Sequence, residues 1–246
     1  MANRYEHIAD DLRRLIAVGT WPTGDRLPAE QELAVRYKVS TPTLRNALEV
    51  LQGEGLIEKR HGSGNFVRRP GQRMTYANTR FGEAEQKAAS DAAVSVGCDT
   101  RTVEVDGQLA LFLGLEAGSP VTEYVFVGHQ GTSPRSLARI YVPHVVARLG
   151  APTAIESVWG DEVRELLSAA GVQVTRTTER ITARFPTTTE AQTLRITTRS
   201  PVLAVERVST DATERVVEGA LLVLPGDRTD ILVTTGSAPE RLERSR

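Results

Sequence analysis

The sequence predicts an α+β protein in two parts, a helical amino-terminal region followed by a larger region of antiparallel strands. Three observations support this prediction. Apolar residues recur at helical spacing in the first region, which ends in a short glycine-containing hairpin. From about residue 101 onward, runs of Val, Ile, Leu and Thr alternate with Gly, Pro and Asp, as strands alternate with turns. The chain has 246 residues, of which 40% are hydrophobic, and this length suffices for two modest domains.

Composition excludes several classes of protein. No run of about 18 apolar residues is present to span a membrane, and the first residues lack the apolar core of a signal peptide. The single cysteine, Cys98, cannot form an internal disulfide or a zinc site of several thiolates, and nothing beside it marks a nucleophile. The four histidines are scattered, and no phosphate-binding glycine loop of the Walker type is present. We therefore expect a cytoplasmic protein without a metal, a cofactor or catalytic residues.

Three helices are predicted in the first region. The first is amphipathic and ends near Gly19. Pro28 suits the first position of a short second helix, and the acidic residues that follow it favour the positive end of the helix dipole. Ser40 or Thr41 can cap the third helix, with Pro42 in its first turn. The third helix carries an inward apolar stripe of Leu44, Ala47, Leu48 and Leu51.

Two short basic strands, residues 56–60 and 65–69, follow the third helix and are joined by a turn at residues 61–64. Three helices with a tight turn before the third, followed by a basic hairpin, are the layout of a winged helix-turn-helix. A major groove about 12 Å wide admits one helix, and the planar fork of Arg45 can bind a guanine edge or a phosphate. The same layout also occurs in purely structural domains, so at this point DNA binding is a hypothesis.

Residues 4–68 resemble the DNA-binding domain of the GntR family of bacterial transcription regulators. The matching residues include Pro22, Gly24, Leu27, Pro28, Glu30, Leu33, Ala34, Val39, Ser40, Thr43, Leu44, Arg45, Ala47, Leu48, Gly62, Gly64, Phe66 and Val67. The resemblance and the basic hairpin together imply these DNA-binding residues: Gln31, Ser40, Thr41, Thr43, Arg45, Arg60, His61 and Gly62. Arginine is common in the family at the position of Thr41 and frequent at that of Gln31. This chain therefore lacks two of the family's candidate contacts, which leaves its operator sequence open.

The second region predicts an antiparallel sheet with short helices. A helix over residues 163–170 ends at Gly171, and another short helix covers residues 189–194. A sheet that is covered on one face commonly leaves a pocket beneath its helices or loops. The predicted strands cover residues 103–105, 121–127, 139–143, 177–185, 202–208, 216–224 and 230–233.

The order of these elements resembles the UTRA ligand-binding domain of HutC-type GntR regulators. The motifs that carry this resemblance include Leu113-Gly114-Leu115, Tyr141-Val142-Pro143, Pro201-Val202-Leu203, Val217-Glu218 and Gly226-Asp227-Arg228. The resemblance implies a chorismate-lyase-like fold that binds a small effector and forms a homodimer.

Three residues are candidates for effector binding. Glu218 matches a glutamate that faces the pocket in related proteins, and Arg139 and Arg184 would supply positive charge. Relatives that sense sugar phosphates carry two arginines where this chain has Phe126-Val127-Gly128, so a less charged or more apolar effector is favoured. Arg207 and Arg228 are alternative effector-binding residues. The other interpretation is a set of structural ion pairs at strand ends that involves Arg207, Asp227 and Arg228.

The chain is thus divided into a DNA-binding domain at 1–69, a linker at 70–100, an effector-binding and dimerisation domain at 101–238 and a tail at 239–246. We expect a homodimeric transcription regulator whose partners are double-stranded operator DNA and a small molecule, with no membrane, and which acts as a repressor that the effector releases. Two alternatives stay open. One is an enzyme, since the implied fold also hosts lyase chemistry, and the other is a constitutive DNA-binding dimer that takes no effector.

Overall fold

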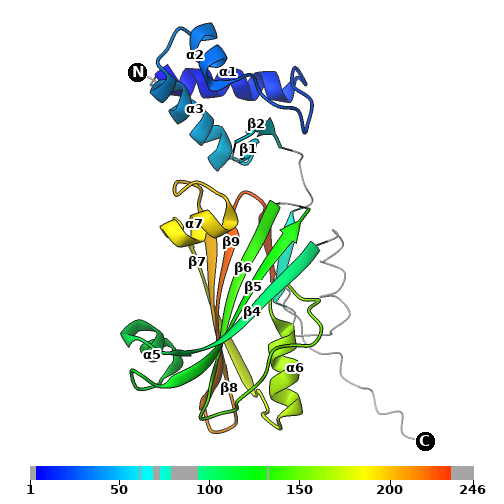
Figure 1. The fold of residues 1–246 in the computed structure, drawn as a ribbon, viewed down its shortest axis with the longest axis vertical. Helices are drawn as coiled ribbons and strands as arrows, with labels where there is room; N and C mark the ends of the chain where they lie inside the picture. The colour runs from blue at the N-terminus through cyan, green and yellow to red at the C-terminus, as the bar shows by residue number, and fades with distance from the viewer. Residues whose placement is uncertain (1–3, 61, 69–72, 79–93, 132, 234–246) are drawn as a thin grey trace, which may run out of the picture.

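The structure is a computed structural model, which describes residues 4–60, 62–68, 73–78, 94–131 and 133–233. Figure 1 shows an amino-terminal part of small helices and a hairpin at one end of a longer part built on a sheet. We call residues 4–68 the amino-terminal part and residues 73–233 the sheet part. The predicted α+β fold class is confirmed.

The amino-terminal part has the three predicted helices and the predicted hairpin. One apolar core joins them, and its centre consists of leucines from all three helices and the loop before α2. The third helix buries the predicted stripe against the first. The bounds are α1 Arg4–Ala17, α2 Glu30–Arg36, α3 Thr41–Gly53, β1 Ile57–Arg60 and β2 Gly64–Val67.

Local sequence explains where these helices begin. Ser40 is the N-cap of α3, and its side chain accepts a hydrogen bond from the Thr43 amide at 3.4 Å. Pro42 lies in the first turn of α3, where it costs no intrahelical hydrogen bond. The prediction for the second helix was wrong in one detail, because α2 begins at Glu30 and Pro28 precedes it. The Glu32 carboxylate accepts from the Ala29 amide at 3.1 Å and so defines the later start.

The sheet part is organised around six antiparallel strands in the order β4-β5-β6-β9-β8-β7. A separate parallel pair, β3 with β10, brings together segments that lie far apart in the sequence. The strands are β3 Met74–Asn78, β4 Val94–Glu104, β5 Pro120–Gln130, β6 Ser133–Pro143, β7 Arg176–Arg184, β8 Val202–Thr210, β9 Val216–Pro225 and β10 Thr229–Val233.

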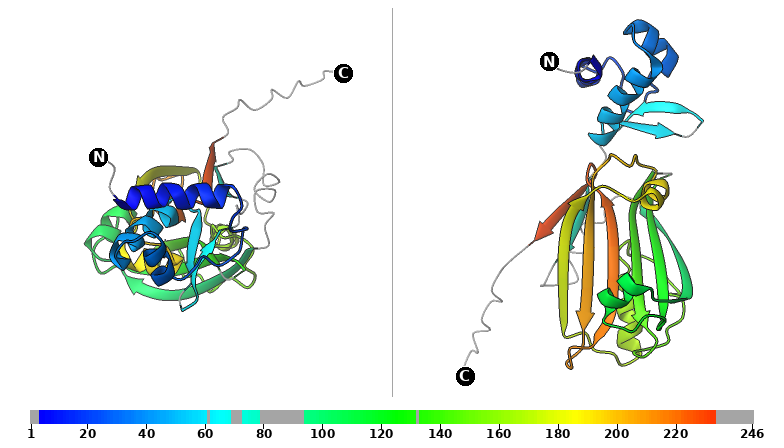
Figure 2. Two further views of the ribbon diagram at one scale, coloured as in Figure 1. Left: turned by 90° about the horizontal axis from the view of Figure 1, so that it is seen from above. Right: turned by 90° about the vertical axis from the view of Figure 1, so that its left-hand side faces the viewer.

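The two faces of the six-stranded sheet carry different helices. Helix α6, Asp161–Ala169, packs on one face through Val163 and Leu167. Helices α5, Gly107–Leu113, and α7, Thr188–Leu194, pack on the other face in two smaller clusters. Figure 1 places α7 at the end of the sheet nearest the amino-terminal part, and Figure 2 shows the same arrangement from two further directions.

The sheet part differs from the sequence-based expectation in two places. Residues 70–100 are predicted as a linker, whereas the structure forms β3 and the first half of β4 there. Strand β3 needs β10 as its partner, and local sequence does not reveal such a distant pairing. Helix α5 was not predicted, because its one short apolar run has no helical periodicity. The Asp106 side chain starts this helix by accepting from the Leu109 amide at 2.9 Å.

No helix among the described residues is both long enough and apolar enough to cross a bilayer.

Candidate nucleic-acid interface and effector site

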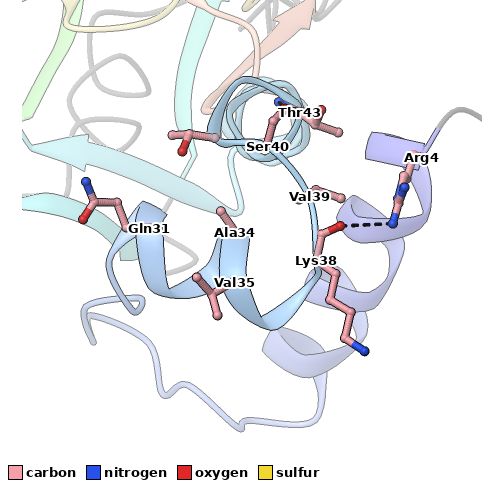
Figure 3. Close-up of a pocket in the computed structure, with 9 residues that line it drawn as sticks. Arg4, Gln31, Ala34, Val35, Lys38, Val39, Ser40 and Thr43 are labelled. Atoms are coloured by element: carbon pink, nitrogen blue, oxygen red, sulfur yellow. Dashed lines mark hydrogen bonds between the residues drawn. The ribbon is translucent and has the colours of Figure 1, made fainter.

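A groove of about 670 Å³ lies between α2 and α3 and reaches the start of α1. Four of the predicted DNA-binding residues line it, and they supply one amide and three hydroxyl groups from two helices. We call it the α2–α3 groove, and Figure 3 shows its residues. The lining residues are Arg4, Gln31, Ala34, Val35, Lys38, Val39, Ser40, Thr41 and Thr43.

Five of these lining residues were not predicted to bind DNA, and three of the five, Arg4, Lys38 and Val35, add two charges and an apolar contact. The Arg4 guanidinium donates from Nη2 to the Lys38 carbonyl at 3.1 Å, which fixes the start of α1 beside the turn. Lys38 adopts a left-handed conformation, φ 50°, in the turn between α2 and α3. Val35 is 79% exposed although it lies on a helix with a buried side. An exposed valine beside hydroxyls is suited to contact a thymine methyl group.

Arg45 lies on α3 outside the groove lining, with its side chain 60% exposed. Its Nε donates to Glu30 Oε2 at 2.7 Å, and this hydrogen bond lowers the pKa of the Glu30 carboxyl. The two terminal nitrogens of Arg45 make no hydrogen bond within the described residues. Glu30 therefore holds the stem of Arg45 in place and leaves its outer edge for a phosphate or a guanine.

In the hairpin, the predicted DNA-binding residue Arg60 is held by contacts with other hairpin residues. Arg60 pairs with Glu58, with its Nη2 2.7 Å from Oε1, and its guanidinium lies 4.3 Å from the centroid of the Phe66 ring. Gly62 has a φ of 72°, and apart from its two chain neighbours no atom of the described residues lies within 4 Å of the position of a Cβ there. It is therefore suited to close approach by a phosphate. His61 lies outside the described residues.

In the sheet part, Glu218 is fully buried on β9, and its carboxylate accepts from donors on strand β8 and helix α6. Arg207 Nη2 donates to its Oε1 at 2.8 Å. Arg164 Nε of α6 and the Ser209 hydroxyl each donate to its Oε2 at 3.2 Å. Burial by itself raises the pKa of Glu218, but the charges of Arg207 and Arg164 outweigh it and hold that pKa below its ordinary value. We call these four residues the Glu218 cluster.

Aromatic and acidic side chains continue this cluster under α6. The Tyr76 hydroxyl of β3 donates to Glu179 Oε1 at 2.5 Å, and its ring meets that of Trp159 edge-on with centroids 5.2 Å apart. Arg207 also donates to the Trp159 carbonyl at 3.4 Å, while its buried Nε has no hydrogen-bond partner in the part of the chain that the structure describes. This unsatisfied donor belongs to a polar site with hydroxyl, indole and phenol groups close by.

The structure does not bring the three predicted effector residues together. Arg139 pairs across the sheet with Val125 and Leu221, which pack in the clusters under α7 and α5. Glu218 shares its face with Ala220, which packs under α6. Arg139 and Glu218 therefore lie on opposite faces of the sheet.

Arg184 also lies away from Glu218. Its cross-strand partner is Val202, which packs with α7. Its guanidinium donates from Nη1 to Glu190 Oε2 at 2.7 Å and from Nη2 to Glu190 Oε1 at 2.8 Å. Glu190 in turn forms the capping box of α7 with Thr187. The arrangement gives Arg184 a structural role at the start of that helix.

Arg207, Asp227 and Arg228 each take part in an ion pair, as the structural interpretation of these residues expects. Arg207 pairs with Glu218, and both residues are buried. Asp227 pairs with Arg228, with Arg228 Nε 3.1 Å from Oδ1, and also with Arg68 of the amino-terminal part. Arg164 and Tyr76, which sequence reasoning missed, complete the surroundings of Glu218. No local signal marks them, because they reach it from α6 and from β3.

Comparison with known proteins matches both parts of the chain. The family of bacterial regulatory proteins named gntR matches residues 4–67, and the UTRA domain matches residues 98–230. The HTH-type transcriptional repressor NagR of Bacillus subtilis is 25% identical over 224 residues, which cover 91% of each chain. The HTH-type transcriptional repressor PhnF of Mycolicibacterium smegmatis is 29% identical over 213 residues, 83% of this chain and 82% of PhnF.

The fold is also similar to that of a solved structure. The crystal structure of PhnF from Mycobacterium smegmatis aligns with a TM-score of 0.53 at 25% identity, covering 94% of this chain and 99% of that one. The UTRA match alone spans more than half of the chain, and the gntR match covers the helices and the hairpin in front of it. The chain therefore belongs to the GntR family of transcription regulators, in the HutC subfamily that carries a UTRA domain, and is not an enzyme.

Proposed function

We propose that the protein is a homodimeric repressor that leaves its operator when a small polar molecule binds beneath α6. The observation that carries this proposal is the pair of distinct sites. One is the α2–α3 groove, with its hydroxyl groups and cations, and the other is the Glu218 cluster, with its unsatisfied Arg207 donor. Two relatives, NagR and PhnF, bear the name repressor.

The geometry of α3 supports insertion into the major groove. Thr41, Thr43 and Arg45 lie in its first two turns, which is the end that contacts bases in helix-turn-helix proteins. A dimer would place two such helices in successive major grooves. An effector that alters the spacing of the two helices would then lower the affinity for the operator.

Replacing Arg45 with alanine is expected to weaken specific operator binding by about 1–3 kcal/mol, because the variant loses a bidentate donor at the DNA surface. A gel-shift or fluorescence titration on the operator fragment measures the loss. Arg14→Ala is the matched control, since Arg14 is an exposed, ion-paired arginine of α1 outside the α2–α3 groove. Equal operator affinities of Arg45→Ala and the wild type would remove Arg45 from the contacts.

The charges in the effector site favour a ligand with little net charge. Arg207 and Arg164 are balanced by Glu218 and Glu179, so a phosphate group would find no excess of positive charge there. Glu218 can accept from a hydroxyl or an amine, and Arg207 Nε offers an unused donor. A polyol, an amine or an amino acid fits this set of groups.

Replacing Arg164 with glutamine is expected to weaken effector binding about tenfold and to spare operator binding. Of the two arginines in the Glu218 cluster, Arg164 is the accessible one, because its side chain is 34% exposed whereas that of Arg207 is 4% exposed. Thermal shifts with a panel of sugars, amines and amino acids identify a ligand, and its titration against both proteins measures the change. Glu165→Gln, at an exposed neighbour on α6, is the control. If Arg164→Gln binds that ligand as tightly as the wild type, the effector site lies elsewhere. If no compound raises the melting temperature, a constitutive DNA-binding protein is favoured.

A further inference from the structure

A second cavity, of about 500 Å³, lies where the amino-terminal part and the sheet part meet. We call it the junction cavity. The amino-terminal part contributes the end of α3 and strand β1, and the sheet part contributes α7, the turn after it and Arg228. Its lining includes three cationic residues, Lys59, Arg195 and Arg228, and one acidic residue, Glu58. Lys59 Nζ also lies 4.0 Å from Glu30 Oε1. Hydroxyl groups of the turn after α7 line the same space.

The contacts that hold this junction together gather around Asp227. Arg68 of the amino-terminal part forms an ion pair with Asp227 Oδ2, and the two side chains are 9% and 3% exposed. Arg228 Nε donates to Asp227 Oδ1 at 3.1 Å. Gly55 lies so close that a Cβ at that position would come within 2.9 Å of Asp227 Oδ2. The two parts are therefore in tight contact beside the cavity.

Positive charge exceeds negative charge at this contact. Arg135, only 7% exposed, is the third buried arginine near Asp227. Burial and the charges of Arg68 and Arg228 together lower its pKa to about 10. Glu58, the other nearby carboxylate, already pairs with Arg60 at 2.7 Å. Arg68 and Arg228 thus form ion pairs with Asp227, and the charge of Arg135 acts close to the same carboxylate.

Two of these arginines have donors that protein groups do not satisfy. Arg135 Nε is buried and lacks a hydrogen-bond partner among the described residues. Arg228 uses Nε and Nη1 for Asp227, Ser133 and the Pro134 carbonyl, whereas its Nη2 makes no hydrogen bond within the described residues. Arg228 is one of the residues that line the cavity. Buried positive charge in excess of its partners is costly, and an anion would relieve that cost.

We propose that the junction cavity binds a small anion, a phosphate or carboxylate compound, between the amino-terminal part and the sheet part. The anion would meet Arg228 at the base of the cavity, with Lys59 and Arg195 from its two walls. Because its ligands come from both parts, the anion stabilises their docked arrangement. The junction cavity shares no lining residue with the α2–α3 groove and contains no residue of the Glu218 cluster.

Calorimetric titration of the full-length protein with inorganic phosphate tests the proposal, with chloride varied to keep the ionic strength constant. We expect saturable binding that Lys59→Gln and Arg195→Gln each weaken about tenfold, since each removes one charge from opposite walls of the cavity. Two control variants remove one charge elsewhere. Lys38→Gln removes a charge from the α2–α3 groove, and Arg164→Gln removes one from the effector site. They are expected to leave the phosphate affinity within about twofold of the wild type.

A parallel titration with citrate distinguishes the two sources of negative charge. Tighter phosphate binding supports a phosphorylated ligand, and tighter citrate binding supports a carboxylate. The proposal is overturned if neither anion binds saturably at constant ionic strength. It is also overturned if Lys38→Gln or Arg164→Gln abolishes binding while Lys59→Gln and Arg195→Gln do not, because the anion then binds at the DNA surface or at the effector site.

Discussion

Replacing Glu218 with alanine is expected to lower the free energy of unfolding of the sheet part by about 3–5 kcal/mol. The substitution leaves Arg207, which is 3% exposed, with its charge buried and unpaired. It also removes the acceptor of the Ser209 hydroxyl, which has no exposed surface. This decrease in the free energy of unfolding should far exceed the decrease that an ordinary surface substitution causes.

Denaturant unfolding, followed by circular dichroism, measures this effect. Glu165→Ala is the control, because Glu165 is an exposed glutamate on α6. The double variant Glu218→Leu/Arg207→Met removes both charges together and is expected to recover part of the loss. A cost below about 1 kcal/mol for Glu218→Ala would mean that water or a rearranged side chain compensates Arg207. Because of this cost, Arg164→Gln tests effector binding more cleanly than any change at Glu218.

Replacing Asp227 with alanine is expected to destabilise the protein by a similar amount, about 3–5 kcal/mol. Its side chain is 3% exposed and is the carboxylate shared by Arg68 and Arg228, with Arg135 close by. Without it, three buried guanidinium groups repel one another at the junction. The amino-terminal part should then lose its attachment to the sheet part along with the stability.

Asp230→Ala is the matched control, since Asp230 lies three residues away and its ion pair with Arg73, at 2.7 Å, is half exposed. Thermal unfolding should show a large decrease in melting temperature for Asp227→Ala and little change for Asp230→Ala. Limited proteolysis should cleave Asp227→Ala faster between the two parts. If both variants unfold like the wild type, the Asp227 ion pairs contribute no net stability and the junction is held by other contacts.

Local sequence patterns determined the elements of the amino-terminal part. The stripe on α3, the Ser40 cap and the glycine hairpin are signals within a few residues of each other, and the helices and strands formed where these signals placed them. Four of the predicted DNA-binding residues line one groove for the same reason, because they lie close together along α2, α3 and the turn between them. Arg45 joins that surface from the outer side of α3.

Sequence alternation determined the strands of the six-stranded sheet but not which residues meet across it. Alternation predicts which side chains of one strand lie on the same face of the sheet. Strand order and register decide which residues of neighbouring strands lie side by side on that face. Arg139 and Glu218 were grouped by residue type, and the pairing of β6 with β9 places them on opposite faces. Arg184 was grouped with them as well, and its partner is the nearby Glu190.

Only the tertiary structure decided what surrounds Glu218 and Asp227. Arg164 reaches Glu218 from a helix 54 residues earlier, and Arg68 reaches Asp227 across 159 residues. Likewise, β3 forms a strand only because β10 returns beside it. Such contacts depend on the path of the whole chain, since charge pairs and strand pairs carry no periodic signal in the sequence around them. Helix starts, turns and strand alternation are local events of the backbone, and for that reason the sequence by itself determined them.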